Sequence, residues 1–182
     1  TNSQKVVEFI TLLNGYSVYF KKYGSIIKRG DGTDATWQKA YKKLKNGDTI
    51  YCNCATCINW AFREMGLMNT SNFYYKNGGG FQNISSKLDN VTKIVTKANG
   101  MTTEEAAKKG LLKYGDIIGL NVGSLQHTFV YAGMDKKGNL LNYESGGDAL
   151  KAIKGKNYPN GCGPFKLGYK SHKIGSILRF TE

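Results

Sequence analysis

Apolar residues recur at helical spacing in the first part of the chain. Residues 4–14 carry such a repeat and predict a helix, with Ser3 as its N-cap. A shorter repeat over residues 37–44 predicts a second, amphipathic helix. The clearest repeat covers residues 53–65 and ends before Gly66, a residue well suited to terminate a helix. One face of this predicted helix presents Cys54, Cys57, Ile58, Ala61, Phe62 and Met65.

The second half of the chain changes to the pattern of β-strands. Residues 69–100 are polar and rich in glycine and asparagine, and they predict loops around short elements. Thr102 and Glu105 have the spacing of a capping box, which predicts a short helix closed by Gly110. Runs of β-branched and aromatic residues, separated by turn residues, then predict strands over 117–120, 128–132, 140–143 and 174–180.

The order of these elements indicates the fold class. Helices come first and strands afterwards, and no linker, repeat or low-complexity tract divides the two halves. This order predicts an α+β fold in which N-terminal helices pack on an antiparallel β-sheet. The length of 182 residues suits a single domain over residues 1–182.

The charge of the chain narrows the range of partners. Its 26 Lys and Arg against 13 Asp and Glu give a formal net charge of +13, which favours contact with polyanions such as nucleic acid, anionic membranes or teichoic-acid-rich cell wall. Only Arg29, Arg63 and Arg179 could supply the bidentate contacts of base reading, so we expect no specific nucleic-acid partner. No stretch approaches the ~20 apolar residues of a membrane span, and none is expected.

Candidate chemistry begins at Cys54. If Asn53 caps the helix, Cys54 lies in its first turn, where free N–H groups and the helix dipole favour a thiolate. The same N–H groups can stabilise the oxyanion that forms when sulfur attacks a carbonyl. A cysteine in this position is also often only a small buried hydrophobic residue. A catalytic interpretation therefore needs a partner for the thiol.

His127, at the start of a predicted strand, is the candidate base. A catalytic imidazole needs a third polar group to orient it, and a neighbouring antiparallel strand can supply one. Asn142 and Glu144 lie two residues apart on the next strand, where one residue more or less in the 135–138 turn decides whether they face His127. We rank Asn142 first and Glu144 second. The other histidine, His172, lies in a basic tail and is interpreted as a surface residue.

Four sequence blocks, in this order, resemble the NlpC/P60-like cysteine peptidases and the related amidase-type domains of phage endolysins and wall hydrolases. They are Lys5 to Ile10 with Gly15 and Tyr19, Asn53-Cys54-Ala-Thr-Cys-Ile-Asn-Trp-Ala-Phe62, Tyr114-Gly115-Asp116-Ile-Ile, and His127-Thr-Phe-Val-Tyr-Ala-Gly133 followed by Asn139-Leu-Leu-Asn142. The chain departs from the family pattern at Asn53, Ala55 and Phe129, where Asp, Ser and Gly are usual.

The resemblance implies a papain-like fold in which Cys54 is the nucleophile and His127 its base. It implies a thiol peptidase or amidase that needs no cofactor or metal and cleaves an amide bond in the stem peptide of peptidoglycan. Such an enzyme is secreted and located at the cell wall, or is associated with a phage. We expect it to act as a monomer on peptidoglycan and anionic cell-wall polymers.

Other interpretations of the same residues remain open. Cys52, Cys54, Cys57 and Cys162 could supply four thiolates to a zinc ion, although the second Cys-x-x-Cys pair of such sites is missing. A disulfide from Cys162 to Cys52 or Cys57 suits an exported protein better. The chain could also be a basic module that binds cell wall or nucleic acid without catalysis, or an acyltransferase that uses the same Cys–His pair.

Overall fold

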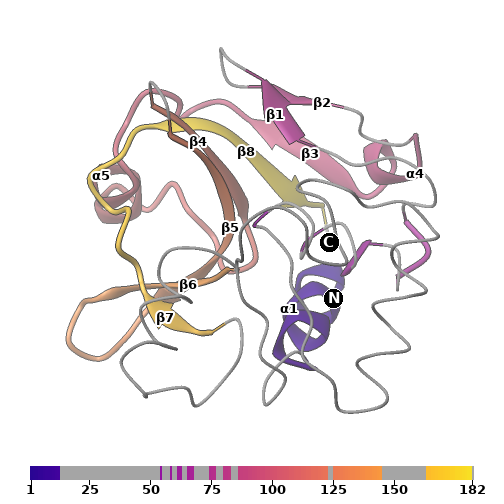
Figure 1. Cartoon of the computed structure of the whole chain (residues 1–182), viewed down its shortest axis with the longest axis horizontal. Helices are drawn as coiled ribbons and strands as arrows, with labels where there is room; N and C mark the ends of the chain where they lie inside the picture. The colour runs from indigo at the N-terminus through magenta and orange to yellow at the C-terminus, as the bar shows by residue number, and fades with distance from the viewer. Residues whose placement is uncertain are drawn as a thin grey trace, which may run out of the picture.

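The main element of the computed structural model is a six-stranded antiparallel sheet with strand order β3-β8-β4-β5-β6-β7 (Figure 1). The structure describes residues 1–12, 54, 58, 61–62, 65–67, 74–76, 80–82, 86–122, 125–144 and 163–181. The strands of the main sheet are β3 (Thr92–Val95), β4 (Ile117–Val122), β5 (Leu125–Met134), β6 (Leu140–Tyr143), β7 (Phe165–Lys166) and β8 (Ile174–Phe180).

A two-stranded sheet and short helices complete the described elements. The small sheet consists of β1 (Tyr74–Lys76) and β2 (Gly80–Gln82), which pair antiparallel. The helices are α1 (Asn2–Leu12), α4 (Ser86–Asp89) and α5 (Thr103–Lys108). The described residues thus combine helices with an antiparallel sheet, as the sequence predicts at this coarse level.

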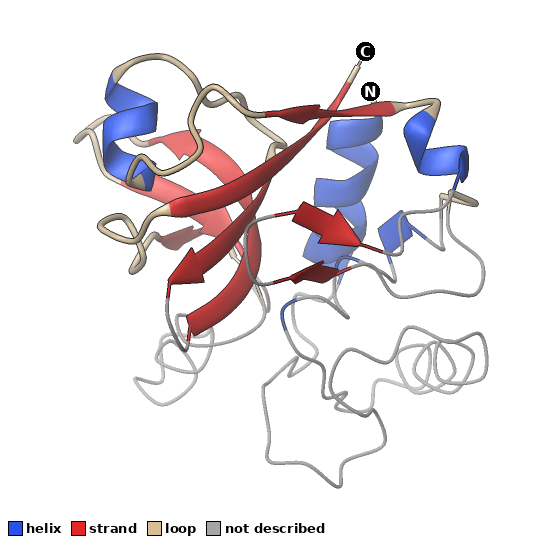
Figure 2. Cartoon of the chain, turned by 90° about the horizontal axis from the view of Figure 1, so that it is seen from above, coloured by secondary structure: helices blue, strands red, loops and turns tan. Residues whose placement is uncertain are grey.

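The main sheet lies between α5 on one side and α1 on the other (Figure 1). Figure 2, seen from above, shows the same arrangement, with twisted strands between the two helices. Successive residues of a strand face opposite sides, and both sides of this sheet are apolar. The buried cluster on the α5 side includes Ala98, Ala106, Ile118, Leu120, Phe129, Tyr131, Ile174 and Ile177. On the other side, the Phe180 ring packs edge-on against Phe62, with ring centroids 6.0 Å apart.

Helix α1 begins earlier than the sequence predicts. Its cap is Thr1, whose hydroxyl accepts a hydrogen bond from the Gln4 N–H, while the Gln4 side chain accepts one from the terminal amine. Ser3 is therefore not the N-cap. Instead it packs against Gly115, where a Cβ atom built on the glycine would lie 2.4 Å from Ser3 Cβ. A side chain at position 115 would push α1 off the sheet.

The helix predicted around Cys54 is described at a few positions. Cys54, Ile58, Ala61 and Phe62 have α-helical backbone conformation, and all except Cys54 are buried. At its end, the Leu67 N–H donates to the Phe62 carbonyl across Gly66, which has φ +70°. This is the hydrogen bond of a Schellman motif, and it confirms Gly66 as the terminating residue. Asn53 and the helix predicted over residues 37–44 lie outside the described residues.

The local signals of the second half are confirmed. Thr102 caps α5 in a capping box with Glu105, and Gly110 follows with φ +68°. Strands β6 and β8 match their predicted ranges, and β4 extends two residues further. Strand β5 begins at Leu125, so His127 is its third residue and not its first. Strand β3 lies in the region predicted mainly as loop, and the sequence did not reveal β7.

An ion pair joins the start of β4 to the last described strand. The Asp116 carboxylate, 1% exposed, accepts hydrogen bonds from Arg179 Nε and Nη2, each at 2.7 Å. Asp116 Oδ2 also accepts a hydrogen bond from the Lys113 N–H, and Arg179 Nη2 donates one to the Leu111 carbonyl. Asp116 thus ties the loop after α5 to β8, which gives the Tyr114-Gly115-Asp116 block a structural role.

None of the helices in the described part of the chain is long and apolar enough to cross a membrane.

Candidate active site

The candidate site is centred on the His127 imidazole. His127 pairs across the ladder with Leu120 of β4, which places its side chain on the same side of the sheet as Leu120 and Phe129. Its ring lies 4.7 Å from the Tyr169 ring and 6.0 Å from the Phe129 ring, measured between centroids. Only 5% of the residue is exposed. These contacts leave the imidazole little freedom to turn.

The third residue in contact with His127 is Glu144. His127 Nε2 and Glu144 Oε2 form a hydrogen-bonded ion pair, and the Glu144 side chain has no exposed surface. In the β5–β6 ladder, Asn142 pairs with Tyr131 and Tyr143 with Val130. Continuing the same register by one residue places Glu144 opposite Phe129. Glu144 is then the diagonal neighbour of His127 on the same side of the sheet, within reach of a long side chain.

Asn142, ranked first from the sequence, does not make this contact. It lies opposite Tyr131, which is four residues along β5 from His127, a separation of about 13 Å at ~3.3 Å per residue. Asn142 is fully buried, and neither polar atom of its side chain has a hydrogen-bond partner in the described part of the chain. The ranking was therefore wrong about the contact, although both residues do share the face of His127.

A β-bulge in β5 determines which face of the sheet Asn142 and Glu144 occupy. Met134 pairs with Leu140, but Tyr131 pairs with Asn142, so β5 contains one residue more than β6 over this stretch. Had the register of Met134 continued, Asn142 and Glu144 would face away from His127. Gly133, with φ +80°, lies inside the bulge and supplies a backbone conformation that other residues rarely adopt. The extra residue at the bulge thus turns Glu144 toward the imidazole.

Cys54 completes the chain of contacts. It is half-buried, and its side chain shares a hydrogen bond with His127. Because Glu144 occupies Nε2, the ring nitrogen left for the sulfur is Nδ1. Cys54 and His127 therefore meet, as the sequence predicts, although they lie far apart along the chain. Glu144 joins them as the third residue.

The pKa of His127 is raised to about 10 from its ordinary 6.5. Burial acts to lower this pKa, but the negative charge of Cys54, its hydrogen bond and the contact with Glu144 raise it by more. The imidazolium is thus stabilised on both sides, by sulfur at one nitrogen and by carboxylate at the other. Such a site can hold a thiolate and an imidazolium together near neutral pH.

Tyr169, which the sequence did not single out, adjoins the site, and His172 lies next to it. Tyr169 lies between the two histidines, since its ring packs on His127 and meets the His172 ring edge-on at a centroid distance of 5.6 Å. His172 is half-buried rather than fully at the surface. Tyr169 follows β7 in a turn without any catalytic motif, so only the folded chain reveals its position.

The remaining candidate residues stay predictions. Cys52, Cys57, Cys162 and Tyr19 lie outside the described residues, and so do the zinc site and disulfide that the cysteines would form. Among the residues that are described, His, Cys, Asp and Glu form no group of three or more that could hold a metal ion. A scan against models of known protein families finds no match to the chain, and a search of curated proteins finds none either. The candidate site is therefore defined by its own chemistry: a thiol, an imidazole and a carboxylate in contact.

Proposed function

We propose that the protein is a cysteine peptidase or amidase that hydrolyses an amide bond in the peptide part of peptidoglycan. The observation that carries the proposal is the chain of contacts from Cys54 through His127 to Glu144. A thiol paired with a buried imidazole, which is itself oriented by a carboxylate, is the arrangement that thiol hydrolases use. The antiparallel sheet with helices beside it is compatible with the papain-like NlpC/P60-type fold that the sequence blocks resemble.

The reaction follows from the order of the three groups. The Cys54 thiolate attacks the carbonyl carbon of the amide, and the carbonyl electrons move to oxygen to form a tetrahedral oxyanion. As this collapses, the C–N bond breaks and the His127 imidazolium gives its proton to the departing amine. A thioester on Cys54 remains. Water, deprotonated by His127, then attacks it, releases the carboxylic acid and restores the thiolate–imidazolium pair.

Glu144 acts without taking up the proton. Its carboxylate accepts the hydrogen bond from His127 Nε2, which holds the ring so that Nδ1 faces the sulfur. The same charge stabilises the imidazolium before the proton is transferred. The first role requires a hydrogen-bond acceptor at this position, and the second requires the negative charge of a carboxylate.

Charge and sequence resemblance support the choice of substrate. A net charge of +13 favours attraction to walls rich in anionic polymers, where peptidoglycan is found. The ordered blocks around Cys54, Asp116 and His127 are similar to those of wall-degrading enzymes. We therefore propose a secreted or phage-associated enzyme that acts at the cell wall as a monomer.

Zymography on purified cell walls tests the proposal. The wild-type protein should clear the walls, whereas Cys54→Ala and Cys54→Ser should not, because both lack the thiolate. Mass spectrometry of the released fragments should find one new amine and one new carboxyl group per cut. A wild-type protein that binds walls without cleaving them would favour the non-catalytic binding module. Transfer of an added amine to the fragments would indicate an acyltransferase.

A further inference from the structure

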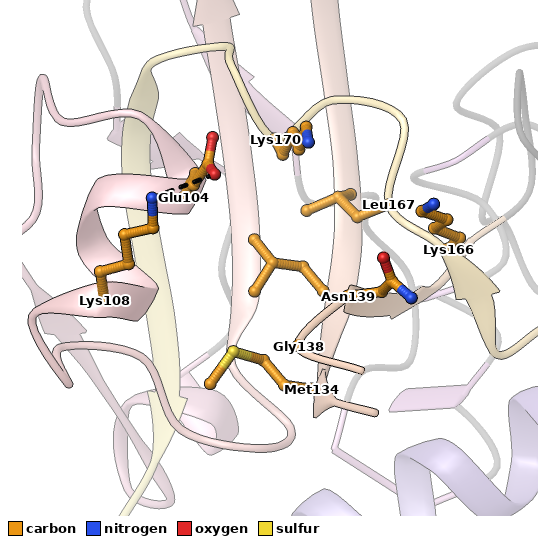
Figure 3. A pocket seen from close by; sticks show the side chains of 9 residues that line it. Glu104, Lys108, Met134, Gly138, Asn139, Lys166, Leu167 and Lys170 are labelled. Carbon is orange, nitrogen blue, oxygen red and sulfur yellow. Dashed lines mark ion pairs between the residues drawn. The ribbon is translucent and has the colours of Figure 1, made fainter. Parts of the chain in front are cut away.

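A pocket opens on the sheet, and none of Cys54, His127 and Glu144 lines it. It has a volume of about 100 Å³ and lies between α5, the end of the β5–β6 hairpin and β7 with the turn that follows it. Figure 3 shows Glu104 and Lys108 of α5 at one side of the pocket and Lys166, Leu167 and Lys170 at the other. This is well below the roughly 300–1,000 Å³ of pockets that enclose a drug-sized ligand. The pocket thus suits one small group and not a whole sugar or peptide.

The lining of the pocket is positively charged. Three lysines and one glutamate give it a formal charge of +2. Glu104 is already paired with Lys108 at 3.3 Å on the exposed surface of α5. Lys166 and Lys170, in contrast, have no carboxylate within ion-pair distance among the described residues. Two ammonium groups therefore remain available to an anion from solution.

Apolar side chains line the rest of the pocket. Leu167 is 4% exposed and forms part of the sheet's buried cluster. Met134 is 55% exposed and is one of the few large apolar side chains on the described surface. An anion that binds here would place its charged group next to the lysines and its adjoining carbon atoms against Met134. A fully hydrated free ion would leave that apolar surface unused.

The lysines also indicate the kind of anion. The planar fork of arginine matches carboxylate and phosphate alike, whereas a lysine ammonium acts as a point charge, and two such groups can approach different oxygens of one tetrahedral phosphate from different directions. The only described arginine, Arg179, is bound to Asp116 and does not line the pocket. One phosphate group with short carbon chains on both sides would match the size, charge and apolar surface together.

We propose that this pocket binds one phosphodiester of an anionic polyol-phosphate polymer, and so acts as a second attachment point of the protein on the cell wall. The choice of a wall polymer rests on the proposed function, whereas phosphodiester binding does not. Met134 lies seven residues after His127 on β5, at most about 23 Å away at ~3.3 Å per residue. A polymer held here would keep the candidate active site beside its wall and raise the local substrate concentration.

The test measures binding of a soluble poly(glycerol phosphate) to the Cys54→Ala protein by isothermal titration calorimetry. The probing variant combines Lys166→Glu with Lys170→Glu. Its matched control combines Lys93→Glu with Lys97→Glu, which makes the same change in net charge. Lys93 belongs to β3, at the opposite edge of the sheet from β7, and both control lysines are exposed. Thermal melts of each protein check that folding is preserved.

The pocket variant should weaken binding about tenfold or more, and the control less than about twofold. Equal weakening in the two variants would show that binding is spread over the charged surface, and would overturn the proposal. Tight binding of polyglutamate would refute the preference for phosphate. Single-stranded DNA that binds as tightly, and with the same sensitivity to Lys166 and Lys170, would refute the wall polymer as partner.

The outcomes for the two proposals remain separate. If walls are cleaved, the pocket variant should raise KM on intact walls and leave kcat on a short soluble stem peptide unchanged. If walls are not cleaved by any variant, the calorimetry still decides whether the pocket binds phosphodiesters. Cleavage without any loss of polymer binding in the pocket variant would reject the pocket and retain the enzyme.

Discussion

Replacing Glu144 with glutamine removes one negative charge from beside His127 and keeps the size of the side chain. In the folded protein the carboxylate accepts a hydrogen bond from Nε2, and together with Cys54 it raises the pKa of His127 to about 10. The amide oxygen of glutamine can still accept the hydrogen bond, but it provides no charge. The substitution should therefore weaken the imidazolium and leave the geometry of the site in place.

The size of the effect follows from the burial of the pair. His127 and Glu144 have side chains that are 6% and 0% exposed, so solvent screens their interaction little. A hydrogen bond to a charged group contributes about 1.5–3 kcal/mol, and 1.36 kcal/mol corresponds to a factor of ten. We expect Glu144→Gln to lower kcat/KM about ten- to one-hundred-fold. The alkaline limb of its pH profile should move down by about one to two pH units.

Three measurements check this expectation. The first is the pH profile of kcat/KM on a stem peptide, whose alkaline limb reports the loss of the imidazolium proton. The second needs no substrate: the rate at which iodoacetamide alkylates Cys54, followed peptide by peptide because other cysteines are present. Stability gives a third view. Since the pKa of folded His127 lies above its ordinary 6.5, its contribution is complete below pH 6.5 and is lost as pH rises toward 10. Glu144→Gln should flatten this decline.

Asn142→Leu provides the matched comparison. Its side chain is of similar size and replaces an amide that has no hydrogen-bond partner among the described residues, so activity should be retained. The reasoning would be refuted by an unchanged pH profile in Glu144→Gln, or by a loss of activity in Asn142→Leu as large as that in Glu144→Gln.

Three further expectations concern the ring packing, the α1 contact and metals. Tyr169→Ala should lower kcat about two- to tenfold because the His127 ring loses its packing, whereas Tyr169→Phe should not; equal losses would show that the hydroxyl matters instead. Gly115→Ala should destabilise the fold by about 3 kcal/mol or more in denaturant unfolding, because it adds a clash with Ser3 to the cost of a positive φ. Gly110→Ala, with open space around its Cβ, should cost about 1–2 kcal/mol. Wall cleavage should survive a chelator, and loss of activity with rescue by zinc would favour a metal site at the cysteines.

Signals that act over a few residues predicted much of this fold. The capping box at Thr102, the glycine that ends the helix at Gly66 and the turn closed by Gly138 are each formed by neighbouring residues. Their geometry depends on local hydrogen bonds and backbone preferences, which the sequence shows directly. The runs of β-branched and aromatic residues that form β4, β6 and β8 are local in the same sense.

Features that depend on distant residues could not be predicted in this way. Strand β3 has only four residues, Thr92–Val95, and forms because β8, more than seventy residues later, offers it an edge. The choice between Asn142 and Glu144 depended on the bulge at Gly133, and a glycine in a strand does not by itself reveal how many residues the ladder skips. The packing of Tyr169 on His127 likewise joins segments that only the complete fold brings together.

The position of β8 in the sheet has a consequence for biosynthesis. Although it is the last described strand in the sequence, β8 lies between β3 and β4 and is hydrogen-bonded to both. While the ribosome is still synthesising residues 174–180, each of those strands presents an open edge, and open edges promote aggregation. Arg179, the partner of buried Asp116, also belongs to this strand, 63 residues after Asp116. The nascent protein should therefore complete its sheet only after translation of this strand, and chains cut short before it should be insoluble and prone to degradation.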